Sequence, residues 1–406
     1  MSTSTPVGRP TTLPRLPVLD SLRGVWVLAL VTAHTAFWAG SYTRNGVWGT
    51  MLARLDVGVA LFFVLSGVLL SYPYLARAQQ HVARPRVAPY LWRRFLRIYP
   101  VYVLTVVCAL LLIEGNRDAT ARDWLTTLLL ADVYVHPAFP EGLTQMWSLA
   151  VQVSFYLLLP ALMLAATGRK RHLSRARLVA VLVGLVAVTL VWHLGLATRV
   201  AAHVDGSPTQ WLPAYTLWFA VGIGLALVRV LHDAATPPGR VRRLLTTLAA
   251  LPGSCWAIAA GLMLVAATPL AGPAALAETS PAQSLTKNVL YAGVALFLVL
   301  PGLLGTDGRF ASAFSWRPLR HLGAISYGVY CLHLSVIHLV MWMTGYQVFG
   351  GHGWQIWLLT LTLSLAAAEL VYRLVERPAM RLRTRARPGA GGDASTSAPT
   401  TETSTR

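Results

Sequence analysis

The stretch LDSLRGVWVLALVTAHTAFW, Leu19 to Trp38, is mostly apolar, yet it contains Asp20, Arg23 and His34. About twenty such residues let an α-helix cross the hydrocarbon core of a bilayer. On a helix, the eleven steps from Arg23 to His34 turn through about 1100° and rise about 16 Å, so both side chains share one face. Ionisable residues inside a span are costly and typical of functional sites. The stretch therefore predicts a membrane-spanning helix with a functional face.

The composition extends this prediction to the whole chain. The 406 residues are 55% hydrophobic and only 12% charged, whereas soluble proteins carry about 25% charged residues. The formal net charge is +19, and the basic residues cluster between apolar runs. This pattern indicates loops that face anionic lipid, and it argues against nucleic-acid binding. We expect an all-α polytopic membrane protein in contact with membrane lipid.

Ten apolar runs have the length of a membrane span. They lie near 19–40, 56–76, 98–114, 146–166, 177–197, 211–231, 251–270, 288–304, 321–344 and 354–376. A further run, Trp124 to Val135, is too short to cross. Arginine clusters within 77–97 and 169–177 should both be cytoplasmic, which requires an even number of crossings between them. The sequence predicts ten transmembrane helices, one short re-entrant or interfacial segment on the outer side, and both termini in the cytoplasm.

This topology divides the chain into three parts. We expect a cytoplasmic N-terminal segment at 1–17, a ten-span membrane domain at 18–378, and a basic, then disordered, cytoplasmic tail at 379–406. Loops outside the spans reach only about twenty residues, so the chemistry is expected within or beside the bundle. The three cysteines lie in apolar runs and form no CxxC pair. No metal site or disulfide is therefore predicted.

Six motifs, in order along the chain, resemble the signatures of the acyltransferase family 3 membrane proteins. They are LDSLRGVWVLALVTAH (from Leu19), LFFVLSGVLLS (61–71), WRRFLRIYPVY (92–102), MWSLAVQVSFYLLLP (146–160), LGAISYGVYCLHL (322–334) and ERP (376–378). The resemblance implies an O-acyltransferase of the bacterial plasma membrane that moves an acyl group, usually acetyl, from acyl-CoA. Its acceptor would be a hydroxyl of a sugar, an envelope glycan or a secondary metabolite. Acyl-CoA would be a co-substrate, and no bound cofactor is expected.

His34 is the candidate catalytic residue of the first span. A neutral imidazole, with a pKa of about 6.5, can take the proton from an acceptor hydroxyl as it attacks a thioester. It could instead accept the acyl group and pass it on, and the sequence leaves both routes open. Arg23, Arg94 and Arg97 are expected at one cytoplasmic level, where guanidinium groups would bind the phosphates of CoA.

Polar residues on the faces of two further spans are expected to line the substrate cavity. They are Ser148, Gln152 and Tyr156 on the fourth span, and Ser326, Tyr330 and His333 on the ninth.

Gln152 also stands where the family's Trp-Ser-Leu motif continues with glutamate. We place it as a catalytic partner of His34 that accepts a hydrogen bond from the imidazole. Because glutamine lacks the negative charge, reduced activity is expected.

Two other functions suit a bundle of this kind. A transporter or flippase of a lipid-linked sugar or small metabolite would also have many spans and buried polar residues. Such proteins usually show two related halves with paired broken helices, and no such repeat is visible in the sequence. The substitution at Gln152 raises a third possibility, an impaired acyl-CoA binder with a regulatory role.

Overall fold

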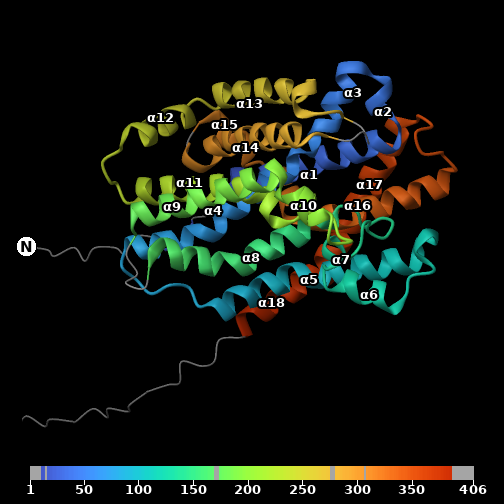
Figure 1. Cartoon of the computed structure of the whole chain (residues 1–406), viewed down its shortest axis with the longest axis horizontal. Coiled ribbons are helices and arrows are strands. Elements are labelled where there is room, and N and C mark those ends of the chain that lie inside the picture. Colours follow the sequence, from blue (N-terminus) through green and yellow to red (C-terminus); the bar gives the residue numbers. More distant parts are fainter. Residues whose placement is uncertain (1–10, 14–15, 169–172, 275–278, 306–307, 386–406) are drawn as a thin grey trace, which may run out of the picture.

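The computed structural model of the chain describes residues 11–13, 16–168, 173–274, 279–305 and 308–385. In this part of the chain every regular element is a helix. Figure 1 shows the long helices side by side along the longest axis of the molecule. The predicted terminal segments lie largely outside the described residues, although the start of the C-terminal segment belongs to helix α18 (Arg377–Arg385).

Within the described residues, eight helices are long and apolar enough to cross a membrane, or nine if one bent pair forms a single span. The eight contain α4 (Gly58–Gln79), α5 (Val87–Leu112), α8 (Met146–Thr167), α9 (Arg175–Val191), α11 (Thr216–Asp233), α14 (Pro281–Leu304), α16 (Arg317–Thr344) and α17 (Gly353–Val371). α9 continues into α10 (Ala197–Ala201), and a short helix, α15 (Arg309–Phe314), precedes α16. The predicted all-α, polytopic membrane fold is confirmed.

The remaining predicted span, 19–40, is helix α1 (Pro17–Trp38), which has 22 residues. Its length is sufficient for a span at about 1.5 Å per residue. It is not one of the nine helices that are apolar enough to cross, because Asp20, Arg23 and His34 lower its mean hydropathy. The helix packs along α16, α17 and α4 in the interior of the bundle. Its polar face therefore meets protein rather than lipid.

The predicted span 251–270 has a different shape. α12 (Arg240–Ala249) and α13 (Pro252–Ala266) form the bent pair and meet at 98°. Proline disfavours the helical conformation of the residue before it, and Leu251 has φ −117° and ψ 70°. α13 alone has 15 residues, about 22 Å, against a hydrocarbon core of about 30 Å.

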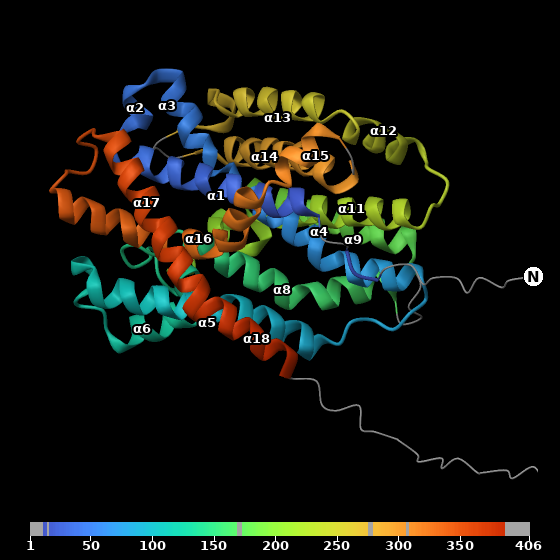
Figure 2. The same ribbon diagram turned by 180° about the vertical axis from the view of Figure 1, so that it is seen from behind.

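The short apolar run between the third and fourth spans does not cross the bundle, as predicted. It folds into α6 (Ala121–Leu128) and α7 (Asp132–Val135), of 8 and 4 residues. α6 begins with a reciprocal cap between Thr120 and Asp123. Figures 1 and 2 place α6 at the same end of the bundle as α2 (Ser41–Arg44) and α3 (Gly46–Ala53).

Glycines allow the central helices to approach closely, which membrane bundles use in place of a hydrophobic driving force. On α11, a Cβ added at Gly222 would collide with the carbonyl oxygen of Val64 on α4, beside Gly67. On α16, a Cβ at Gly323 would collide with the carbonyl oxygen of Asp20 on α1. Both obstacles are backbone atoms, so relief would require the helices to move apart.

We predict that Gly222→Ala lowers the melting temperature of the detergent-purified protein by several degrees, because the methyl group separates α4 from α11. Gly224→Ala, two residues along the same helix, is the matched control, since a Cβ there meets nothing within 4 Å. Thermal unfolding of both variants by intrinsic fluorescence provides the measurement. Equal melting temperatures for the two variants would contradict the close contact.

Candidate functional site

Two histidines from separate helices face each other in the middle of the bundle. His34 Nδ1 on α1 lies 2.7 Å from His333 Nε2 on α16. The two rings are nearly parallel, at 9° and with centroids 5.0 Å apart. His333 is completely buried, whereas His34 is half-buried and lines a cavity.

The backbone around His333 determines which nitrogens carry protons. His333 Nδ1 lies 2.8 Å from the carbonyl oxygen of Tyr330 and 3.1 Å from that of Val329. Carbonyl oxygens only accept, so Nδ1 of His333 carries the proton and its Nε2 is the acceptor in the neutral ring. His34 must then donate from Nδ1. This leaves Nε2 of His34 unprotonated, the form that a general base requires.

The cavity that His34 lines has a volume of about 590 Å³. We call it the outer cavity because residues of α2 and α3, at the end of the bundle that also holds α6, contribute to its wall. Aromatic side chains, Asp56, Lys287 and Asn288 also line it.

The second cavity, of about 280 Å³, is here called the inner cavity. Four arginines from α1 and α5 line it, namely Arg23, Arg93, Arg94 and Arg97. Its lining, among the described residues, includes no aspartate or glutamate. The inner cavity is therefore positively charged and suited to an anionic ligand.

The inner cavity brings together most of the predicted site. Eight of the ten predicted residues line it: Arg23, Arg94, Arg97, Ser148, Gln152, Tyr156, Ser326 and Tyr330. The other two, His34 and His333, form the pair described above. These residues come from α1, α5, α8 and α16, which lie far apart along the chain.

The two cavities adjoin at Val59, Ser148 and Tyr330, which line both. Tyr330 donates its hydroxyl hydrogen to the carbonyl oxygen of Gln145 at 2.7 Å. Ser148 Oγ lies 2.9 Å from the same phenol oxygen and 3.3 Å from the same carbonyl oxygen. These fixed hydroxyls mark the place where a ligand in one cavity would meet a ligand in the other.

The arginines of the inner cavity differ in how they are held. Arg97 forms an ion pair with Glu376, a fully buried carboxylate in the π-helical turn Tyr372–Glu376 that follows α17. Arg23 lies 3.5 Å from Asp20 on its own helix. Arg94 packs over the ring of Tyr156, 5.8 Å from its centroid. Sequence analysis missed Glu376 as a partner of Arg97, because no spacing relates residues 279 positions apart.

Gln152 has different neighbours from those predicted. Its side-chain nitrogen donates to Ser66 Oγ at 2.9 Å and to the hydroxyl of Tyr156. His34 is hydrogen-bonded to His333 instead, so the expected bond between His34 and Gln152 is not formed in the structure. The physical reason is depth, since Gln152 lies one helical turn beyond Ser148 and lines only the inner cavity.

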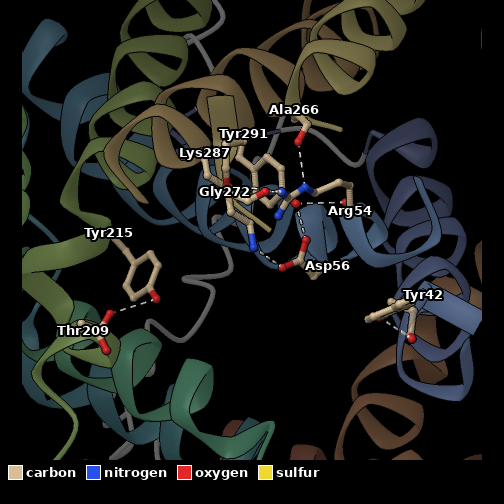
Figure 3. A network of polar contacts seen from close by, with 11 residues as sticks. Tyr42, Arg54, Asp56, Thr209, Tyr215, Ala266, Gly272, Lys287 and Tyr291 are labelled. Atoms are coloured by element: carbon tan, nitrogen blue, oxygen red, sulfur yellow. Dashed lines mark hydrogen bonds and ion pairs between the residues drawn. The ribbon is translucent and has the colours of Figure 1, made fainter. Parts of the chain in front are cut away.

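A polar cluster in the outer cavity was also missed by sequence analysis. Lys287 Nζ lies 2.7 Å from Asp56 Oδ2, and the hydroxyl of Tyr291 donates to Asp56 Oδ1. Arg54 donates to three backbone carbonyl oxygens beside them (Figure 3). The signal was present in the sequence, because Asp56 and Lys287 stand at the starts of two apolar runs.

A family model described as an acyltransferase domain matches residues 16–373. Because the match covers nearly the whole described chain, the protein belongs to the acyltransferase family 3 of membrane proteins. No solved structure matches the chain.

Three curated relatives match most of this chain. The chain is 26% identical to the peptidoglycan O-acetyltransferase OatA of Listeria monocytogenes, over 89% of this chain and 55% of the relative. It is 28% identical to nodulation protein 10 of Rhizobium leguminosarum bv. viciae, over 84% and 86%. It is 26% identical to the acyltransferase MdmB of Streptomyces mycarofaciens, over 94% and 96%. The chain thus spans about half the length of OatA but nearly all of MdmB.

We predict that His333→Phe lowers kcat for acetyl transfer about tenfold or more while the KM for acyl-CoA stays the same. The phenyl ring fills the space but cannot accept the hydrogen bond that fixes the tautomer of His34. His333→Gln should retain more activity, since its carbonyl oxygen can accept that bond. Steady-state kinetics in matched membranes provide the measurement. Equal loss in both variants would reduce His333 to a packing role.

Proposed function

We propose that this chain is an O-acyltransferase that transfers an acyl group, acetyl in the first instance, from acyl-CoA to a hydroxyl of a carbohydrate or a secondary metabolite. The observation that carries the proposal is the pair of His34 and His333, which leaves Nε2 of His34 free beside a cavity. Family membership favours this function over a transporter or a non-catalytic binder.

The inner cavity is the proposed donor site. Arginines bind phosphate through charge-assisted hydrogen bonds, and four of them line this cavity. CoA carries its phosphates at one end and the thioester at the end of a flexible arm. In our proposal the phosphates lie at the arginines, and the arm extends along the cavity towards Ser148 and Tyr330. Since acyl-CoA is cytosolic, this end of the bundle would face the cytoplasm of a bacterial cell, with both termini on that side.

The chemistry then follows from the pair of histidines. His34 Nε2 removes the proton from the acceptor hydroxyl, and the oxygen attacks the thioester carbon. The tetrahedral intermediate collapses, the C–S bond breaks, and the proton on Nε2 passes to the leaving sulfur to give free CoA. While His34 is protonated, it still donates from Nδ1 to the neutral His333. The pair therefore holds the ring in one orientation through both proton transfers.

We predict that His34→Ala lowers acetyl transfer by about 10²-fold or more, the usual contribution of a positioned general base. Membranes containing the full chain would be incubated with radiolabelled acetyl-CoA, and transferred label counted per amount of protein. His203→Ala is the matched control, because His203 is exposed and its ring Nδ1 lies 2.8 Å from the carbonyl oxygen of Arg199. Near-normal turnover of His34→Ala would remove this residue from the mechanism.

We predict that Arg94→Gln raises the KM for acetyl-CoA by about 10- to 100-fold with little change in kcat, as expected for the loss of a bond to a charged group. The exposed Arg240 on α12 provides the control variant Arg240→Gln. Initial rates at varied acetyl-CoA concentration separate the two parameters. A change in expression or membrane orientation alone would show that Arg94 is only a positive-inside anchor.

A further inference from the structure

The outer cavity contains far more fixed polar groups than the histidine chemistry uses. They include the ion pair of Asp56 and Lys287, whose side chains line the cavity and are 37% and 30% exposed. Figure 3 shows this pair beside Arg54 and Tyr291, with Tyr42 and Tyr215 on opposite sides of it in this view.

The ion pair is held in one geometry, but its two groups do not use all their hydrogen-bond donors and acceptors. Tyr291 donates to one oxygen of Asp56, and Lys287 donates to the other while its ammonium lies 5.2 Å from the tyrosine ring. A carboxylate offers about four acceptor positions and an ammonium three donors. Within the described residues, both groups therefore keep free capacity at the cavity wall.

Two buried carboxamides in the same wall carry oxygens without a partner. Asn288 and Gln145 are each 4% exposed, and the side-chain nitrogen of each donates a hydrogen bond to a backbone carbonyl oxygen. This assigns the amide orientation, because a carbonyl can only accept. The oxygens of both amides then find no donor among the described atoms. Buried polar atoms are rarely left without a hydrogen-bond partner. A ligand rich in hydroxyl groups would supply the missing donors at this wall.

The remaining wall is aromatic. Trp38, Trp147, Trp218, Tyr42 and Tyr215 all line the outer cavity. Flat apolar faces combined with a few fixed polar groups are the usual form of a small-molecule site. A sugar ring matches both parts, since it presents C–H groups on its faces and hydroxyls around its rim.

We propose that the outer cavity is the acceptor subsite and that Asp56 and Lys287 together anchor a sugar ring through neighbouring hydroxyls. The assignment rests on the proposed acyl transfer. A hydroxyl both donates and accepts, so one hydroxyl gives its hydrogen to Asp56 while its neighbour accepts from Lys287. The anchored ring presents a further hydroxyl to His34, which lines the same cavity. An alcohol with a single hydroxyl cannot occupy the anchor and react at the same time.

The experiment compares two acceptors with radiolabelled acetyl-CoA: methyl hexopyranosides and cyclohexanol, which has the same ring size but one hydroxyl. In the wild-type protein the glycosides should give a kcat/KM at least tenfold above that of cyclohexanol. Lys287→Met and Asp56→Asn should each reduce this ratio at least tenfold. Glu114→Gln, which removes an exposed ion pair with Arg117, is the control and should preserve the ratio.

Binding is measured separately, as thermal stabilisation of the purified protein by the glycosides without acetyl-CoA. Equal use of both acceptors by the wild type, or an unchanged ratio in both variants, would overturn the sugar anchor. If one variant fails to fold, the other decides. If the wild type transfers acetyl to neither acceptor, the proposed function fails. Glycoside stabilisation that disappears in Asp56→Asn would still support the site, and no stabilisation of the wild type would overturn it.

Discussion

The hydrogen bond between His34 and His333 depends on how closely α1 and α16 approach, and the rest of the site is arranged around it. Gly24 packs on Gly323, with an added Cβ on Gly24 only 2.9 Å from the backbone nitrogen of Gly323. His34 lies ten residues after Gly24, and His333 lies ten residues after Gly323. Equal spacing on both helices means that α1 and α16 run in the same direction, with the second contact about 15 Å beyond the first. The glycine contact thus sets the register in which the histidines meet.

Parallel packing of these two helices agrees with the predicted order of spans, in which they are the first and the ninth. Much of the fold was predictable because lipid leaves few options, since every backbone polar group in the bilayer core must be satisfied within a helix. The bend at Leu251 was not predicted, because a hydropathy window averages over the proline that begins α13. Helix existence follows from composition, but helix shape depends on single residues.

The site was predictable to a similar extent. Helical periodicity identified which faces of α1, α8 and α16 are polar, and eight predicted residues do share one cavity. Periodicity gives no information on which helix lies opposite. The sequence therefore paired Gln152 with His34, although the hydrogen-bond partner of His34 is His333. One helical turn along α8 separates Ser148, which reaches both cavities, from Gln152, which reaches only one. Such assignments need the lateral packing of the bundle, which a single sequence does not encode in its spacing.

The position of Gln152 also changes what the departure from the family motif means. A pair of neutral histidines orients the base without burying a net charge, which is costly in an apolar interior. In the proposed mechanism the base therefore does not depend on a carboxylate at residue 152. In the inner cavity, Gln152 lies among arginines of which Arg23 and Arg97 already have acidic partners. A glutamate there would offset a further positive charge, whereas glutamine leaves that charge to an anionic ligand. In the proposed mechanism the substitution is thus a feature of the arginine-lined cavity, and the acid–base chemistry belongs to the two histidines.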